Sequence, residues 1–222
     1  MKLLLSLTLL VPFLQGHPIE GDHLAPQATR PTLAVKGFPS DPNRYRAQTA
    51  ALVNAGIPEK YGPDEWAAVV LTHEFHQHVG IYTVLGAKMA VRAREVLHAP
   101  TRSVQVLALT GRTQPLACTL DGLQVGLAST FGQNLIQAPE VEHPAVSAEF
   151  TYEGQHLRLS LKPMYQEKVT AYIRHARALH GNLTPGYFQE VEKACYEVWS
   201  DFDRRDIFAE TLKPIPAAEA DS

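Results

Sequence analysis

Two segments with alternating apolar residues constrain the fold of this chain more than any other feature. Apolar and polar side chains alternate along Ala145–Tyr152 and again along His156–Leu161, and Glu153-Gly154-Gln155 separates the two segments. This arrangement is typical of a β-hairpin with one buried face. Segments with helical periodicity lie before the hairpin and after it. Helices, then a small sheet, then helices again predict an α+β fold, with helices packed on a small central sheet and more helices at the C-terminal end.

Helix-start and helix-stop residues bound the other expected elements. We expect a short strand within Ser103–Thr110 and a short helix at Asp121–Ala128. Two longer helices are expected before the histidines, from Asp41 to about Asn54 and from Pro63 to between Thr72 and Phe75. A third follows the histidines and ends at about Leu97. Two more are expected after the hairpin, one across Val169–Leu179 and one that begins at Thr184-Pro185. Gly86 lies inside the third of these and predicts close approach of another backbone, since a mid-helix glycine costs about 1 kcal/mol relative to alanine.

The N-terminus has the pattern of a targeting segment. A positive start at Lys2 precedes an apolar run, Leu3–Leu14, which is short for a membrane span and ends near a small residue, Gly16. We therefore expect an exported protein, periplasmic or secreted. The expected organisation is a signal peptide at 1–16, an N-terminal arm at 17–40, a single domain at 41–213 and a disordered tail at 214–222.

The composition excludes several classes of protein. The 222 residues are 45% hydrophobic with a formal net charge of −3, which is ordinary for a soluble domain. The absence of a basic excess argues against a nucleic-acid partner and against membrane binding once the signal peptide is removed. Two cysteines, Cys118 and Cys195, exclude a disulfide-dense scaffold and a four-cysteine zinc site. The composition does not decide whether the chain forms a homodimer.

Three of the ten histidines, His73, His76 and His78, fall within six positions. The first pair is three apart and suits one helical face, whereas the second pair is two apart and suits an extended segment. The spacing is one residue short of the helical arrangement used by zinc proteases. Two interpretations stay open at this stage: a metal site, and a solvated helix end whose dipole favours positive charge.

A second stretch, Cys118–Gln124, also carries chemically active groups. A cysteine before a short helix can be a thiolate, because the helix N-terminus lowers its pKa. Asp121 can cap the helix, ligate a metal or accept a proton. From these residues alone, a buried free cysteine with Asp121 as the N-cap is the favoured interpretation.

Taken together, these stretches resemble the FmdE family, whose members are similar to the E subunit of formylmethanofuran dehydrogenase. Phe75–Met89 is similar to its FHGHxCPGxxLGxRM segment, Cys118–Gln124 to its CxxDGIQ segment, and Ser129–Leu135 to its GCTxGKxNL segment. The blocks come in the family's order, and the resemblance extends over roughly Asp64 to Pro214. It implies an α+β fold and a central site for a transition metal such as zinc.

Carried over by position, the resemblance assigns a set of site residues. His76 and His78 fall on the two motif histidines, and Cys118 falls on the motif cysteine. The implied metal ligands are His76, His78 and Cys118, with His73 as a replacement for a lost ligand, and the implied ligand-contacting residues are Asp121, Gln124, Ser129 and Thr130.

The chain departs from the family's pattern at several of these positions. The motif's other two cysteines are Gly80 and Ser129 here, its proline is Ile81, and its middle glycine is Gln77. Loss of thiolates shifts the preference toward an imidazole-rich site. Cys118 can ligate, stay free or pair with Cys195.

These observations predict an exported protein that holds a divalent transition metal, with zinc expected, in an open histidine-rich site that takes a small-molecule ligand. Two alternatives remain: a metal-dependent hydrolase with Asp121 or Glu74 as base, and a non-catalytic metal carrier or partner protein. The few cysteines do not support iron–sulfur clusters.

Overall fold

The structure is a computed structural model, and it describes residues 60–215. The elements in this range are α3 (Pro63–His76), α4 (Ile81–Leu97), β1 (Gln105–Ala108), η2 (Leu116–Cys118), α5 (Thr119–Leu127), η3 (Phe131–Gln133), β2 (Ile136–Gln137), β3 (Ser147–Tyr152), β4 (Gln155–Leu161), α6 (Pro163–His180), α7 (Pro185–Asp201) and β5 (Phe208–Pro214). The expected signal peptide, arm and helix from Asp41 lie outside the described residues. Within 60–215 no helix combines the length and apolar character needed to cross a bilayer.

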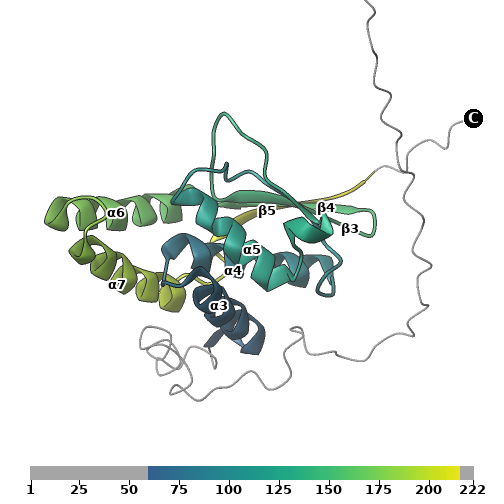
Figure 1. Ribbon diagram of the computed structural model, residues 1–222. Helices are drawn as coiled ribbons and strands as arrows, with labels where there is room; N and C mark the ends of the chain where they lie inside the picture. Colours follow the sequence, from purple (N-terminus) through teal and green to yellow (C-terminus); the bar gives the residue numbers. More distant parts are fainter. Residues whose placement is uncertain (1–59, 216–222) are drawn as a thin grey trace, which may run out of the picture. The chain divides into compact units, whose positions relative to one another are not determined.

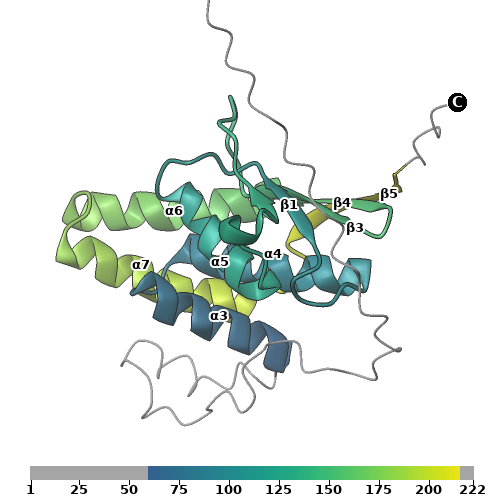
Figure 2. The same ribbon diagram turned by 45° about the vertical axis from the view of Figure 1, so that its right-hand side comes forward.

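The strands form one sheet in the order β2-β1-β3-β4-β5, which is parallel between β1 and β2 and antiparallel elsewhere. The predicted hairpin is β3–β4, in which Phe150 pairs with Leu157. The alternating apolar residues all point to one face and are buried, whereas the residues between them, apart from the buried Ser147, are exposed or half-buried. Helices α3, α4 and α5 lie on one side of this sheet (Figures 1 and 2). The fold is therefore α+β, as the order of elements predicted.

The chain after α7 corrects one prediction. The sequence pattern indicated only helices and a disordered tail beyond the hairpin, but Phe208–Pro214 forms β5 and pairs with the full length of β4. Only Phe208 of this strand is buried, so β5 lacks the alternation by which a strand is recognised. Pro214, expected to begin the tail, pairs with Gln155.

Helices α4 and α5 cross at unusually close range. A Cβ atom added to Gly86 would come well inside 3.0 Å of the Thr119 carbonyl oxygen, and one added to Gly122 would do the same with the Ala87 nitrogen. Only a hydrogen fits at either position, which confirms the close approach predicted from Gly86. The crossing fixes the start of α5, and therefore Cys118 and Asp121, against α4.

A buried charged network holds the start of α3 to α4 and to the segment after α7. The Glu65 carboxylate accepts hydrogen bonds from Lys88 Nζ at 2.6 Å and from Arg204 Nη1 at 2.9 Å. Trp199 Nε1 donates to the same carboxylate at 3.2 Å. Both Glu65 and Lys88 are fully buried, so the charges are matched out of contact with water.

Helices α6 and α7 form an antiparallel hairpin that extends beyond the sheet (Figures 1 and 2). Helix α6 ends before Gly181, at φ 77°, and the Thr184 side chain accepts a hydrogen bond from the Tyr187 backbone N–H at the start of α7. Trp199 and Cys195, both fully buried, lie on the face of α7 that joins the core. The hairpin is thus anchored through α7, while α6 keeps one side toward solvent.

Candidate functional site

The histidine stretch spans the end of α3 and the turn into α4. Helix α3 continues to His76, slightly beyond the predicted end, and Gln77 then takes the left-handed conformation, φ 69°, that stops the helix. The His76 and His78 ring centroids lie 4.1 Å apart. The turn therefore brings together two histidines that neither a continuous helix nor an extended strand would place in this way.

His73 lies one helical turn earlier and is 2% exposed. Neither of its ring nitrogens makes a hydrogen bond of good geometry, although the Gly80 backbone interacts with the ring. Burial, together with the neighbouring His76 and His78, lowers the pKa of His73 to about 3, so the ring is neutral. This corrects the interpretation of a fully solvated helix end. A buried imidazole without a well-formed hydrogen bond is uncommon in folded proteins.

Asp121 faces the histidines from the first turn of α5. Its Oδ2 lies 3.5 Å from His76 Nε2, while His76 Nδ1 lies 3.4 Å from the His78 carbonyl oxygen. An Nδ1–H that donates to this carbonyl leaves the Nε2 lone pair directed at the carboxylate. Two acceptors in this position require a proton or a cation between them. Burial raises the pKa of Asp121, and the two histidines oppose this shift.

Cys118 is half-buried at the N-cap position of α5 and carries a free thiol. Burial, and secondly the charge of Asp121, raise the pKa of Cys118. These two effects on the Cys118 pKa therefore outweigh the lowering that was expected from the helix N-terminus. Asp121 lies inside the first turn and makes no side-chain cap, so its predicted N-cap role is wrong. Cys195 is also free and fully buried in α7, which excludes the pairing with Cys118 left open by the sequence.

Gly80, where the family's motif has a cysteine, also lies at this cluster. A Cβ added there would be 3.8 Å from His78 Nε2 and 3.3 Å from Thr83 Oγ1. A side chain at position 80 would therefore project toward the histidines. The chain has lost a donor from this place without losing the backbone path that would present it.

The remaining predicted residues lie on the loop after α5 and already have structural partners. Ser129 is fully buried, and its hydroxyl donates to the Val104 carbonyl at 3.0 Å. Thr130 caps η3 in a reciprocal pair with Gln133. Gln124 accepts a 3.5 Å hydrogen bond from the Phe131 N–H. A ligand-contacting role for these residues stays a prediction, and none of them lines the cleft described next.

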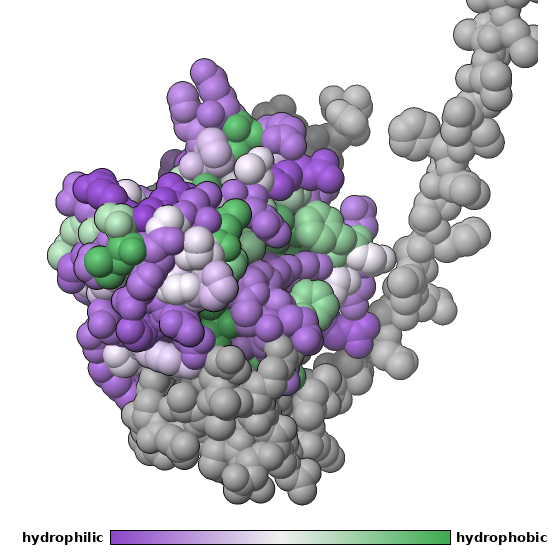
Figure 3. All heavy atoms as spheres, turned by 60° about the vertical axis from the view of Figure 1, so that its left-hand side comes forward, coloured by the Kyte–Doolittle hydropathy of each residue, from purple (hydrophilic) through white to green (hydrophobic). Residues whose placement is uncertain are grey.

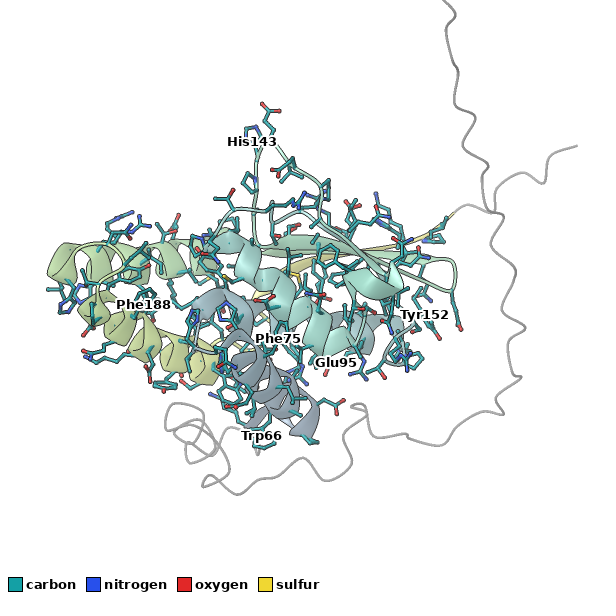
Figure 4. All side chains as sticks on the ribbon, in the orientation of Figure 1. Trp66, Phe75, Glu95, His143, Tyr152 and Phe188 are labelled. Atoms are coloured by element: carbon teal, nitrogen blue, oxygen red, sulfur yellow. The ribbon has the colours of Figure 1, made fainter. Side chains whose placement is uncertain are left out.

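A cleft of about 310 Å³ opens beside the histidines, between α4 and the α6–α7 hairpin. His76, His78 and Cys118 line one part of it, and its other walls include Phe188. The Phe188 ring meets His78 edge-on with centroids 6.3 Å apart. Figure 4 shows Phe188 on α7, whereas His143 stands at the tip of a loop away from these helices.

Much of the cleft wall is apolar, and apolar side chains continue outside it. Of the side chains that line the cleft, Phe188 is 47% exposed and Leu183 is 64% exposed. Phe75, outside the cleft, is 64% exposed. Figure 3 shows apolar surface in several places among hydrophilic surface on the side that it views. Phe188 was not predicted as a cleft residue, because apolar positions in an amphipathic helix are usually part of the core, and Leu183, in the turn between α6 and α7, gave no signal either.

The donor cluster is not pre-assembled around an ion. Within residues 60–215, no set of three or more His, Cys, Asp or Glu side chains is positioned to hold a metal. The chemistry of the donors nevertheless fits a transition metal, since imidazole nitrogens and a thiol suit zinc and its neighbours. The buried His73 ring and the approach of the Asp121 carboxylate to His76 Nε2 at 3.5 Å fit the same interpretation.

The fold and the cluster define an α+β protein with metal-type donors at the mouth of an apolar cleft. The family model described as "FmdE, Molybdenum formylmethanofuran dehydrogenase operon" matches residues 75–201, more than half of the chain. The chain belongs to the FmdE family. Membership suggests a metal-related role.

Two further comparisons add little to this assignment. No curated protein matches the chain. A solved structure, that of a tungsten formylmethanofuran dehydrogenase FmdE-like protein from Syntrophus aciditrophicus, matches at 16% identity with a TM-score of 0.38. That match covers 64% of this chain and 68% of the other. A likeness this distant adds nothing to the assignment of the site.

Proposed function

We propose that this chain is an exported metal-binding protein that holds one divalent transition metal, zinc in the first instance, beside the cleft and binds a small molecule there. The observation that carries the proposal is the convergence of His76, His78, Cys118 and Asp121 around the turn between α3 and α4. The buried His73, whose ring nitrogens make no well-formed hydrogen bond, supports it.

The donors have distinct roles in this proposal. His76 and His78 bind the ion through neutral ring nitrogens, and Cys118 binds it as a thiolate after losing its proton, because metal ligands must be deprotonated. His73 supplies a further nitrogen. Binding requires these side chains to rearrange, since no three of them are positioned to hold an ion at present. Asp121, beside His76, orients that ring and balances the charge of the ion.

The position of the donors on the cleft wall supports an open site. A bound divalent ion polarises a carbonyl or a water molecule that reaches it. His76, His78 and Cys118 all line the cleft, so a molecule that enters it meets the donors directly. The apolar wall excludes water around such a molecule and strengthens its polar contacts.

Metal analysis of the purified mature protein tests the proposal. We expect about one equivalent of a transition metal per chain in the wild type and a loss of most of it in His76→Ala/His78→Ala. His143→Ala/His175→Ala is the matched control, because it removes two exposed histidines from other elements and should retain the metal. Equal metal content in the wild type and in His76→Ala/His78→Ala would contradict the proposal. Identification of the mature N-terminus tests export separately.

A second candidate is a hydrolase, favoured by the carboxyl group of Asp121 next to His76 and by its raised pKa. A carboxylate there can accept a proton from a nucleophilic water. Neither Asp121 nor Glu74, the other predicted base, lines the cleft itself, but Asp121 lies 3.5 Å from the cleft residue His76. We expect a chelator-sensitive esterase activity in the wild type and its loss in Asp121→Asn with the metal retained. Unchanged turnover in metal-loaded Asp121→Asn would exclude this role.

A further inference from the structure

We infer that the cleft takes a small organic carboxylate with an apolar body, and that Arg177 binds its carboxylate group. The inference deepens the proposed function, on which it rests for the position of the metal. It comes from three features of the cleft: its charge, the state of Arg177 and the character of its wall.

Apart from Cys118, whose thiolate the proposed ion would neutralise, the cleft lining carries positive and no negative side-chain charge. The Asp121 carboxylate, 3.5 Å from His76 Nε2, is not part of the lining. The lining includes the Arg177 guanidinium but no Asp or Glu. Neutral groups capable of hydrogen bonding, such as Tyr82 and Asn182, complete the polar part. A cleft with charge of one sign and low-dielectric walls concentrates ligands of the opposite sign. The electrostatics therefore favour an anion over a neutral or cationic molecule.

Arg177 is oriented but has no counter-ion. Its Nε donates to Asn182 Oδ1 at 3.2 Å, which ties the end of α6 to the loop before α7. In the described part of the chain, no carboxylate forms an ion pair with Arg177. The terminal N–H groups are left to bind a ligand, and guanidinium binds a carboxylate through two parallel hydrogen bonds.

Tyr82 marks the place where the anion would lie. Burial and the neighbouring Tyr187 raise the pKa of Tyr82, while the positive charge of Arg177 opposes the shift. The phenol is therefore neutral. Its hydroxyl also interacts with the Gln166 side chain and lies near enough to Arg177 to feel its charge. Tyr82 on α4 and Arg177 on α6 line the cleft from different helices. A hydroxyl and a guanidinium provide hydrogen bonds of the kind that a carboxylate accepts and a primary amide matches less well.

The rest of the cleft wall determines what kind of group can be attached to the carboxylate. Ile81 on α4, Ile173 on α6, and Leu183, Phe188 and Val191 around α7 line the cleft. A wholly polar anion would leave this surface unused. About 310 Å³ is near the lower end of ordinary ligand sites. A short-chain or single-ring acid fits this volume, whereas a polymer, a nucleotide or a long fatty acid does not.

The test compares an acid with its amide. Phenylacetate and hexanoate, each with the corresponding primary amide, are titrated calorimetrically into the mature protein at low salt. We expect each acid to bind at least about tenfold more tightly than its amide, from the strength of hydrogen bonds to charged groups. Arg177→Gln should abolish this preference, and Arg177→Lys should restore part of it. Arg174→Gln removes the same charge from α6 outside the cleft and should leave the preference intact.

Metal content is measured on every variant, and the titrations are repeated on chelator-treated protein. If the wild type holds no metal yet shows an acid preference that depends on Arg177, the proposed metal site fails and the carboxylate inference stands. Equal binding of acid and amide to metal-loaded protein would overturn the inference alone. An acid preference that survives in Arg177→Gln would also overturn it, because the ion would then be binding the carboxylate.

Discussion

The crossing of α4 and α5 makes Gly86→Ala a sharp test of the structure. Two effects oppose each other at this position. Alanine is favoured over glycine in a helix interior by about 1 kcal/mol, so a position with free space would be stabilised. In the structure, the new methyl group would lie well inside 3.0 Å of the Thr119 carbonyl oxygen and 3.1 Å from the Gly122 Cα.

The size of the net effect follows from what must move. Both contacts of the new methyl group are backbone atoms of α5, so no flexible side chain can yield. Overpacking of a core costs about 1–3 kcal/mol and sometimes more, and rigid neighbours place this site at the upper end. After subtracting the gain in helix propensity, we expect a loss of about 2 kcal/mol in the free energy of unfolding. For a domain of this size that loss lowers the Tm by roughly 4–8 °C.

Urea denaturation followed by circular dichroism measures the change, with Gly132→Ala as the control. Gly132 has only Thr130 Oγ1, at 3.8 Å, near a built Cβ, so alanine should be tolerated there. Because α5 carries Cys118 and Asp121, Gly86→Ala should also weaken metal retention. A Gly86→Ala protein as stable as the wild type would refute the crossing distance and the argument built on it.

Three further changes test separate features. Glu65→Gln leaves Lys88 and Arg204 buried without their shared carboxylate, so we expect a loss of about 3–5 kcal/mol in urea unfolding; a loss below about 1 kcal/mol would contradict the network. Gln77→Gly relieves the left-handed backbone at φ 69° and should raise the free energy of unfolding by about 0.5–1 kcal/mol, whereas a decrease would show that the Gln77 side chain matters more. Metal content after dialysis at stepwise lower pH should fall as ligands take up protons. Burial lowers the pKa of His78, so the site should keep its metal below pH 6.5, and release complete well above that pH would contradict this expectation.

Most of the fold could be predicted because its elements carry local signals. Thr184-Pro185 marks the start of α7, and its threonine caps the helix in the structure. Gly181 ends α6, and Glu153-Gly154-Gln155 turns the hairpin. Strand β5 had no such signal. Its place is set by hydrogen bonds to β4, which involve no side-chain pattern of its own.

The candidate site could be predicted only in part. His76, His78 and Cys118 line one cleft, as their grouping suggested. The burial of His73 follows from tertiary packing that spacing alone does not reveal. Arg177 gave no sequence signal, because a single arginine near the end of an amphipathic helix is normally solvated. Its role depends on which helices form the opposite wall.

The cleft joins two parts of the chain that are separate in sequence. The metal-type donors come from positions 76–121, whereas the wall that contacts a ligand's body comes largely from 173–191. The second part is one helical hairpin, held to the rest through the buried face of α7. Substitutions on its cleft side can therefore change which molecule is accepted without altering any proposed donor. Under the proposed function, choice of ligand and choice of metal would be separable, and related proteins could diverge in one property while keeping the other.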